Sequence, residues 1–471
     1  MYNWIVICGG IFSFITAMGI GANDAANAFA TSVGSGALTI KQAAGLAVVF
    51  ETSGAILMGS HVTDTIRKGI SDYQCFENEP ELLMYGCMWV MICVSGWLFA
   101  ATYFELPVST THSCVGGMIG MTVALAGSEC VLWYKQTDNF PYVSGVLGIV
   151  LSWFISPLFS GIFSSGLFAI LRQLVLRSKN SNKRLKLAFP VLVGITLVIN
   201  SFFIIYKGAK GLGLDKIDAS LAIALSCGIG FIGSIITYPI TRCITNKAVK
   251  IHEDVSNKYT PDNITNNSEE LGINSEYELK KVIDFNVSAE KFSNETEESF
   301  KYLQVFSAIC DSFSHGANDV ANAIGPFAAI YLISKDTDIS KKLDMSEDSF
   351  WILSLGGIGI SLGLLLYGKK ITNALGHKLC KITPTRGTCI ELGSALVIIT
   401  GSRLKIPLST THCQVGATVG VGLLENKRCE SINKKLLFKT FFGWLITCVV
   451  AGVSTGLMTA QGVYSPKIVH Q

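Results

Sequence analysis

Residues 21–28 read Gly-Ala-Asn-Asp-Ala-Ala-Asn-Ala, and residues 316–323 repeat them as Gly-Ala-Asn-Asp-Val-Ala-Asn-Ala. A second pair of matching stretches follows the first. Leu-Pro-Val-Ser-Thr-Thr-His at 106–112 returns as Ile-Pro-Leu-Ser-Thr-Thr-His at 406–412. The two pairs keep their order and nearly their spacing along the chain. We infer an internal duplication, with one half of the fold built around each copy.

The sequence around these copies is typical of a membrane protein. Only 15% of the 471 residues are charged, against about 25% in soluble domains, and the mean hydropathy is +0.45. Apolar runs of about 20 residues match membrane-spanning helices rather than barrel strands. The composition excludes a disordered chain, a collagen, a coiled coil and a disulfide scaffold. We therefore expect an all-α polytopic membrane protein with inverted repeats and broken helices or helical hairpins.

We predict about twelve transmembrane segments from the apolar runs. They cover residues 4–27, 38–60, 84–104, 107–127, 141–171, 188–206, 218–241, 303–333, 350–368, 386–402, 407–424 and 436–460. With this count, three loops rich in Lys and Arg, at 172–187, 369–386 and 426–435, fall on one face, which the positive-inside rule makes cytoplasmic. The acidic loop at 77–81 then lies on the other face, and we expect extracellular N- and C-termini.

One long segment is polar instead of apolar. Residues 246–301 are rich in Asn, Ser, Glu and Lys, so we expect a cytoplasmic, mostly disordered linker there. The linker separates two transport-core repeats, each followed by connecting or scaffold helices. The predicted division of the chain is 1–130, 131–245, 246–301, 302–430 and 431–471.

Charge and cysteine usage add two smaller points. The net charge of +3 gives no case for binding nucleic acid. Most of the 14 cysteines lie in apolar runs, where they are expected to be small buried hydrophobes. Cys75 and Cys130 lie in polar loops and could pair.

The number of segments between the copies sets their relative orientation. Seven predicted segments separate the start of the first octamer from the start of the second, and an odd number places the second copy antiparallel to the first. Inverted repeats with interrupted helices are typical of secondary transporters, whose site lies at the repeat interface near the middle of the membrane.

The first octamer places polar groups within an apolar segment. Asn23 and Asn27 share a helix face, with Asp24 about 100° around from Asn23. A carboxylate in the membrane is costly and by default marks a functional site, here a hard-oxygen set for Na⁺ or a carboxylate that takes up H⁺. The second copy repeats the set at Asn318, Asp319 and Asn322. The alternative is that these groups only join helices by hydrogen bonds.

The second pair of motifs predicts an anion cradle. Pro restarts a helix at its first turn, where free N–H groups and hydroxyls bind negative charge. Two such cradles from antiparallel halves could wrap one tetrahedral oxyanion. The hydroxyl-bearing residues are Ser109, Thr110, Thr111, Ser409, Thr410 and Thr411. His112 and His412 could bind an oxygen, shuttle a proton in gating, or satisfy a buried partner.

Charge balance connects the two kinds of motif. Asp24 and Asp319 would repel a bound anion in a medium of low dielectric constant. Cations between them and the anion would make cation and anion binding mutually favourable, as symport requires. Glu51 and Glu391, also inside apolar runs, are each a candidate third cation ligand or gating site.

At these motifs the sequence resembles the inorganic phosphate transporter family of sodium- or proton-coupled phosphate permeases. The paired octamers, the paired Pro-x-Ser-Thr-Thr-His stretches, Phe50-Glu51-Thr52 and Ile390-Glu391-Leu392 carry the resemblance, which spans nearly the whole chain outside 246–301. The resemblance implies twelve segments, external termini, a homodimer and a lipid-embedded transporter, which we place in the plasma membrane. It implies no enzymatic activity and no covalent cofactor.

The resemblance also assigns roles to the motif residues. It implies that the Ser/Thr groups at 109–111 and 409–411 contact phosphate. Na⁺ would be held, and the anion site lined, by Asn23, Asp24, Asn27, Asn318, Asp319 and Asn322. Glu51 and Glu391 match carboxylates that matter in family members.

Several rival interpretations stay open at the level of sequence. Asp24 and Asp319 could form an intramembrane aspartyl protease pair, although the Asn and Ser-Thr-Thr residues would then be unexplained. A Ser–His hydrolase built on Ser109 and His112 lacks an acid that orients the histidine. A transporter of another oxyanion such as sulfate could use the same hydroxyls. An uncoupled channel is a further alternative, but a channel would not need to bind its cation and anion together, as the carboxylate and amide sets suggest. We expect Na⁺:phosphate symport by alternating access, with H⁺ as the alternative coupling ion.

Overall fold

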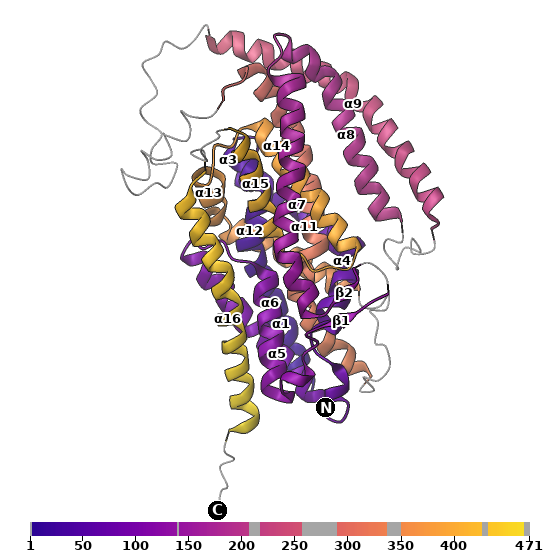
Figure 1. The fold of residues 1–471 in the computed structure, drawn as a ribbon, viewed down its shortest axis with the longest axis vertical. Helices are drawn as coiled ribbons and strands as arrows, with labels where there is room; N and C mark the ends of the chain where they lie inside the picture. The colour runs from indigo at the N-terminus through magenta and orange to yellow at the C-terminus, as the bar shows by residue number, and fades with distance from the viewer. Residues whose placement is uncertain are drawn as a thin grey trace, which may run out of the picture.

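The computed structural model describes residues 2–138, 141–206, 217–256, 290–336, 350–425 and 432–465. These residues are almost entirely helical (Figure 1). One short antiparallel hairpin, β1 (Lys135–Gln136) with β2 (Val143–Ser144), interrupts the helices. The prediction of an all-α membrane fold is therefore confirmed.

The helices follow the predicted segments. The first half contains α1 (Asn3–Ile20), the π-helical turn η1 (Gly21–Ala25), α2 (Ala26–Ala28), α3 (Ala30–Gly34), α4 (Ile40–Lys68), η2 (Tyr73–Phe76), α5 (Pro80–Tyr103), α6 (Thr110–Ala126) and η3 (Ser128–Cys130). The middle contains α7 (Val146–Leu171), η4 (Arg172–Leu176), α8 (Ser181–Ile205) and α9 (Ala219–Ser256). The second half contains α11 (Asn294–Lys335), α12 (Phe350–Tyr367), α13 (Lys369–Lys378), α14 (Pro384–Arg403), α15 (Thr410–Glu425) and α16 (Lys434–Tyr464).

Eight of these segments are long and apolar enough to cross a membrane. They are Asn3–Ala28, Ile40–Lys68, Pro80–Tyr103, Val146–Leu176, Ser181–Ile205, Ala219–Ala248, Phe350–Tyr367 and Lys434–Tyr464. Among the longer helices, α6 and α15 fall outside this set with 17 and 16 residues, and so do the more polar α11 and α14. These four helices carry the second octamer, both Ser-Thr-Thr-His runs and Glu391.

Four of the twelve predicted segments pair into two of the helical hairpins that the sequence led us to expect. α5 packs on α6 and α14 packs on α15, and the first hairpin lies at the opposite end of the molecule from the second (Figure 1). Their tips meet, because the Ser409 hydroxyl donates to the Ser109 hydroxyl at 2.8 Å. A hairpin returns to the face that it entered from, so the number of crossings between the two octamers stays odd.

The two octamers differ in backbone conformation. The first interrupts its helix, since α1 passes at Gly21 into η1 and then into α2 and α3. The second lies inside the continuous 42-residue helix α11. The expectation of broken helices therefore holds at the first octamer, whereas the second octamer lies in an unbroken helix.

The predicted polar linker is shorter at both ends than its composition indicated. α9 continues to Ser256 and α11 begins at Asn294, so 246–256 and 294–301 are helical. The remainder of the predicted linker, 257–289, lies outside the described residues.

The predicted pairing of Cys75 and Cys130 is confirmed. A disulfide joins them across a sequence separation of 55, with 6.1 Å between their Cα atoms. It ties the loop before α5 to the loop before α7, at the end of the molecule where α1 begins and α16 ends (Figure 1). The loop between α7 and α8 lies at the opposite end, so the basic loop and the disulfide are on different faces.

Helices α4 and α11 pack closely because small residues line their contact. A Cβ atom added to Gly54 would lie 2.0 Å from the Phe313 carbonyl oxygen, and one added to Gly316 would lie 2.2 Å from the Glu51 carbonyl oxygen. This close approach brings Glu51 of α4 beside the second octamer.

The close approach gives a stability prediction. Gly54→Val should lower the unfolding free energy by about 3 kcal/mol, because the helices must separate to admit the side chain. The matched control is Gly45→Val on the same helix, where an added Cβ would meet no atom within 4 Å. Thermal melting of both variants in detergent checks the prediction, and equal melting temperatures would show that α4 and α11 are not so tightly packed.

Candidate functional site

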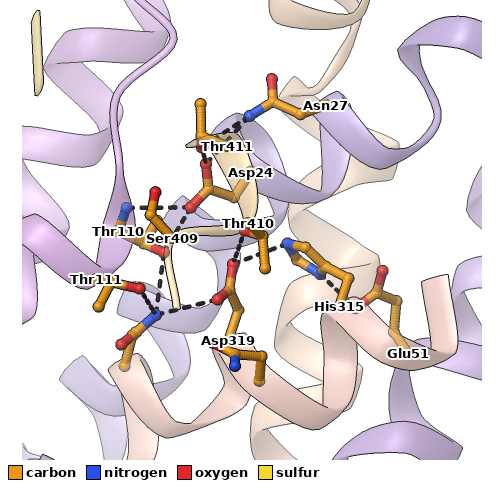
Figure 2. A network of polar contacts seen from close by, with 12 residues as sticks. Asp24, Asn27, Glu51, Thr110, Thr111, His315, Asp319, Ser409, Thr410 and Thr411 are labelled. Atoms are coloured by element: carbon orange, nitrogen blue, oxygen red, sulfur yellow. Dashed lines mark hydrogen bonds and ion pairs between the residues drawn. The ribbon is translucent and has the colours of Figure 1, made fainter. Parts of the chain in front are cut away.

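The site forms where the two hairpin tips meet the two octamers (Figure 2). α6 and α15 begin at Thr110 and Thr410, directly after extended residues that follow a proline. The Ser109 and Ser409 hydroxyls each accept from the backbone N–H of the histidine three residues later, at 3.3 Å. Two helix N-termini with partial positive charge thus converge on the pair of serines.

The tips cross over one another in equivalent ways. The Thr111 hydroxyl donates to the Leu408 carbonyl at 2.8 Å, and the Thr411 hydroxyl donates to the Val108 carbonyl at 3.2 Å. Residues at matching places in the two repeats therefore make matching contacts. This reciprocity brings the two Pro-x-Ser-Thr-Thr-His segments, which the sequence analysis predicts to be anion cradles, side by side.

Asp24 lies at this junction and is surrounded by donors. It accepts from the Thr110 backbone N–H at 3.0 Å, from the Thr110 hydroxyl at 2.5 Å and from the Asn27 amide at 3.2 Å. The Thr411 hydroxyl of the other hairpin donates to it as well. The Asp24 side chain is 1% exposed, so a buried charge is met by hydrogen bonds from both halves.

Asp319 holds the matching position in the second half. It accepts from the Thr410 hydroxyl at 2.6 Å and from the Asn322 amide at 3.3 Å. Its third partner is His315, whose Nε2 lies 3.0 Å from the carboxylate. Figure 2 shows the two aspartates on either side of the hairpin tips.

The two aspartates are joined through shared partners. The Asn322 amide donates to the hydroxyls of Thr110 and Thr111 at 3.2 and 3.1 Å, and Thr110 in turn donates to Asp24. The Asn27 amide makes the equivalent bond to Thr411 at 3.0 Å. Within the described ranges no hydrogen bond joins the two carboxylates directly, which weighs against an aspartyl dyad that shares one proton.

Two buried oxygens in the site lack a partner. Asn27 Oδ1 and Asn322 Oδ1 are both fully covered and accept no hydrogen bond in the described part of the chain. They belong to repeat-related residues, and each amide nitrogen is bonded to the neighbouring aspartate. A buried acceptor without a donor is costly. The residues present therefore fit a cation that prefers oxygen ligands.

Asn23 and Asn318 hold the hairpin breaks in place. The Asn23 amide nitrogen donates to the Thr102 hydroxyl at 3.2 Å and to the Leu106 carbonyl at 3.0 Å, and its oxygen accepts from the Val108 backbone N–H. Asn318 is hydrogen-bonded to Ser402 at 3.1 Å. Both residues thus reach the hairpin of their own repeat, where they position the serine cradle.

Glu51 enters the site through a residue that the sequence analysis did not single out. His315 Nδ1 lies 2.8 Å from Glu51 Oε2, while its Nε2 contacts Asp319, so the imidazole bridges two carboxylates. The Ser312 hydroxyl also donates to Glu51, at 3.2 Å. The position of His315, one helical turn before Asp319, was the available signal. The corresponding residue in the first repeat is Ile20, so nothing in the repeat pointed to it.

Glu391 has a separate set of partners. It accepts from the hydroxyls of Thr31 and Ser32, both at 2.6 Å, and from the Gln304 amide at 3.3 Å. The Ser307 hydroxyl donates to its other oxygen. The carboxylate joins α14 to α3 and α11, away from the pair of aspartates. Glu51 and Glu391 therefore belong to two separate polar clusters, and only Glu51 adjoins the aspartates through His315.

His112 and His412 contact aromatic rings instead of the carboxylates. His112 stacks on Trp153 with ring centroids 3.5 Å apart and lies 4.6 Å from His412, which packs on Trp444 at 3.7 Å. His412 Nδ1 also lies 2.9 Å from the Trp153 carbonyl oxygen. Of the roles predicted for these histidines, the contacts favour a buried partner within the helix packing.

The arrangement suits reversible ion binding better than covalent chemistry. Among the described residues no three His, Cys, Asp or Glu side chains converge as in a transition-metal site. The donors are hydroxyls, amides and helix N-termini, which bind an anion without full charge and can release it. The acceptors are two carboxylates and two orphan amide oxygens, which match Na⁺.

Comparisons with known proteins identify the family. The profile of the phosphate transporter family matches residues 20–455. The chloroplast inorganic phosphate transporter 2-1 of Arabidopsis thaliana is 33% identical over 95% of this chain and 70% of the relative. Sodium-dependent phosphate transporter 1 of Rattus norvegicus is 26% identical over 97% of this chain and 95% of its own length. A solved structure of a sodium-dependent phosphate transporter has a TM-score of 0.80 at 31% identity and covers 98% of this chain and 100% of that one.

Proposed function

Because this chain belongs to the phosphate transporter family, we propose that it carries inorganic phosphate across a membrane in symport with Na⁺. The members of the family with which it was compared are transporters and permeases, so the chain is not an enzyme. Sodium is the proposed coupling ion because two relatives, the rat transporter and the solved structure, carry sodium dependence in their names.

The single observation that carries the proposal is the pair of orphan oxygens, Asn27 Oδ1 and Asn322 Oδ1. Each lies on a residue bonded to a buried aspartate, so each half offers one carboxylate and one free amide oxygen. Such a set binds Na⁺ without the soft ligands that transition metals prefer. Two such sets in one site support the binding of a cation by each half.

Phosphate is proposed to bind at the paired serines. The helix N-termini at Ser109 and Ser409 provide partial positive charge, and the hydroxyls provide donors. Na⁺ at the aspartates would offset their repulsion of the anion, so each substrate favours binding of the other. Asn23 and Asn318 take part by positioning the cradle.

The two halves are proposed to be inverted repeats that rock around this site. The reciprocal hydrogen bonds between the tips support a two-fold relation of the halves. Glu51 contacts His315 beside Asp319, whereas Glu391 contacts α3 and another part of α11. We assign them a role in gating or in a third cation site, with H⁺ as the alternative occupant.

Uptake into proteoliposomes tests the coupling. An inward Na⁺ gradient should drive accumulation of radiolabelled phosphate at least tenfold above equilibrium, whereas an H⁺ gradient or choline should not. Excess sulfate should leave the uptake unchanged. Accumulation driven by H⁺ alone would show that H⁺, not Na⁺, is the coupling ion. Competition by sulfate would favour the alternative function, a transporter of another oxyanion.

We also propose that both termini and the disulfide are extracellular and that the basic loops are cytoplasmic. An oxidising exterior accounts for the disulfide, and basic loops on the other face agree with the positive-inside rule. A plasma-membrane location and a homodimer remain proposals from the family resemblance.

A labelling experiment tests the orientation. Cys130→Ser leaves the exposed Cys75 unpaired, so a membrane-impermeant maleimide added to intact cells should label the variant but not the wild type. Labelling that requires permeabilised cells would reverse the proposed orientation.

A further inference from the structure

A polar cavity lies apart from the transport site, at the turn between α7 and α8. Its volume is about 660 Å³, and the end of the long polar segment, from Glu290 to Glu295, forms one wall. The opposite wall is the turn between Leu176 and Lys183. The volume lies in the range of cavities that bind small organic molecules and exceeds what one small ion requires.

The cavity is lined by cations without acidic partners. Lys179, Lys183 and Lys291 line it, and no ion pair is found for any of them in the described part of the chain. Cations that surround a concave surface on several sides focus the electrostatic potential into it and attract anions. The elbow therefore offers three free positive charges within one cavity.

The two acidic residues at the cavity already have other hydrogen-bond partners. Glu290 is bonded to Arg177 through two contacts, at 2.8 and 2.9 Å, and lies 3.8 Å from Arg172. Glu295 accepts from the Asn182 amide at 2.8 Å. Neither carboxylate neutralises the lysines, so the net charge of the lining remains positive.

The wall formed by the polar segment is held rigidly. The Glu290 backbone N–H donates to Glu425 at 2.8 Å, and the Glu290 carbonyl accepts from Arg386 at 2.8 Å. The Ser181 and Thr296 hydroxyls are bonded across the cavity margin at 2.7 Å. A preformed cavity loses little entropy when a ligand binds.

We propose that this elbow binds a multiply phosphorylated ligand with several phosphate esters on one compact ring. One phosphate would engage one lysine, and only a ligand with several phosphates would contact Lys179, Lys183 and Lys291 together. The same chemistry occurs on a free inositol phosphate and on a phosphoinositide headgroup. This site is independent of the proposed transport function, since it shares no residue with the transport site.

Binding to purified full-length protein tests the proposal. The probes are inositol hexakisphosphate by isothermal titration, and phosphatidylcholine vesicles with or without phosphatidylinositol bisphosphate by co-flotation. The triple variant Lys179→Ala/Lys183→Ala/Lys291→Ala should weaken binding by at least tenfold. The matched control, Lys369→Ala/Lys434→Ala/Lys435→Ala, removes three exposed lysines outside this cavity and should bind as the wild type does.

A variant that should strengthen binding, rather than weaken it, excludes misfolding as the explanation for the loss. Glu290→Gln removes a negative charge from the cavity wall and frees Arg177, so binding should become several-fold tighter. Binding of the free ligand supports a soluble source, and binding only of the vesicles supports a lipid source. No binding of either probe, or equal weakening in the triple variant and its control, would overturn the proposal.

Discussion

Asp24→Asn should abolish Na⁺-driven phosphate uptake while leaving the protein folded. Asp24 carries a buried charge that four donors from both halves surround, and asparagine fits the same space without that charge. The opposite charge is that of the proposed Na⁺, and removal of one partner of a buried pair of opposite charges costs about 3–5 kcal/mol. Because 1.4 kcal/mol corresponds to a factor of ten, uptake should fall by about 100-fold or more.

Two other variants complete this test. Asp319→Asn alters the repeat-related position and should produce a loss of similar size. Asp138→Asn changes an exposed aspartate in a loop and should transport normally. Radiolabelled phosphate uptake and gel filtration of each variant give the comparison, and normal uptake by a well-folded Asp24→Asn protein would remove Asp24 from the mechanism.

The double variant Ser109→Ala/Ser409→Ala should lose phosphate affinity. The two hydroxyls contact one another at 2.8 Å at the point where the helix N-termini converge, so both would face a bound anion. A hydrogen bond to a charged group contributes about 1.5–3 kcal/mol. Loss of two such bonds should raise the phosphate concentration for half-maximal uptake by roughly 100-fold.

The control for this variant lies one turn along the same helix. Ser113 is buried in α6 and its hydroxyl donates to the Ser109 carbonyl at 3.0 Å, so Ser113→Ala changes a serine that does not lie at the tip. It should leave the half-saturating concentration of phosphate within a factor of about two, which is less than 1 kcal/mol. An unchanged value in the double variant would place the anion elsewhere.

The internal repeat made much of the site predictable. Duplicated motifs showed that Asp24 and Asp319, and the two Ser-Thr-Thr runs, belong together, and the structure brings all of them to one junction. The apolar runs located the helices, since length and hydropathy reflect the thickness of the bilayer. The Cys75–Cys130 pair followed from the polar character of its two loops.

Other features depend on contacts between distant segments and left no local trace. The bond between Asn27 and Thr411 spans 384 positions, and the bond between Thr31 and Glu391 spans 360. Apolar length alone could not show that residues 84–127 form a hairpin, because a segment that turns back has the same composition as one that crosses. His315 has Ile20 as its repeat mate, so symmetry could not reveal the bridge between Glu51 and Asp319.

The two octamers also differ in tertiary packing, which the motif alone could not show. Both copies begin with Gly-Ala-Asn-Asp, yet only the first passes through a π-helical turn. A Cβ on Gly21 would lie 1.8 Å from the Ile360 carbonyl oxygen, and one on Gly316 would lie 2.2 Å from the Glu51 carbonyl oxygen. The copies pack against different helices, so tertiary contacts accompany the difference in backbone.

The central claim is that buried acids accept a phosphate between them only when cations lie beside it. The most direct measurement is the dissociation constant of phosphate for the purified protein, with Na⁺ and with choline in its place at the same ionic strength. The account predicts binding at least tenfold tighter in Na⁺, and by linkage an equal strengthening of Na⁺ binding by phosphate. Equal phosphate affinity in the two salts would contradict it.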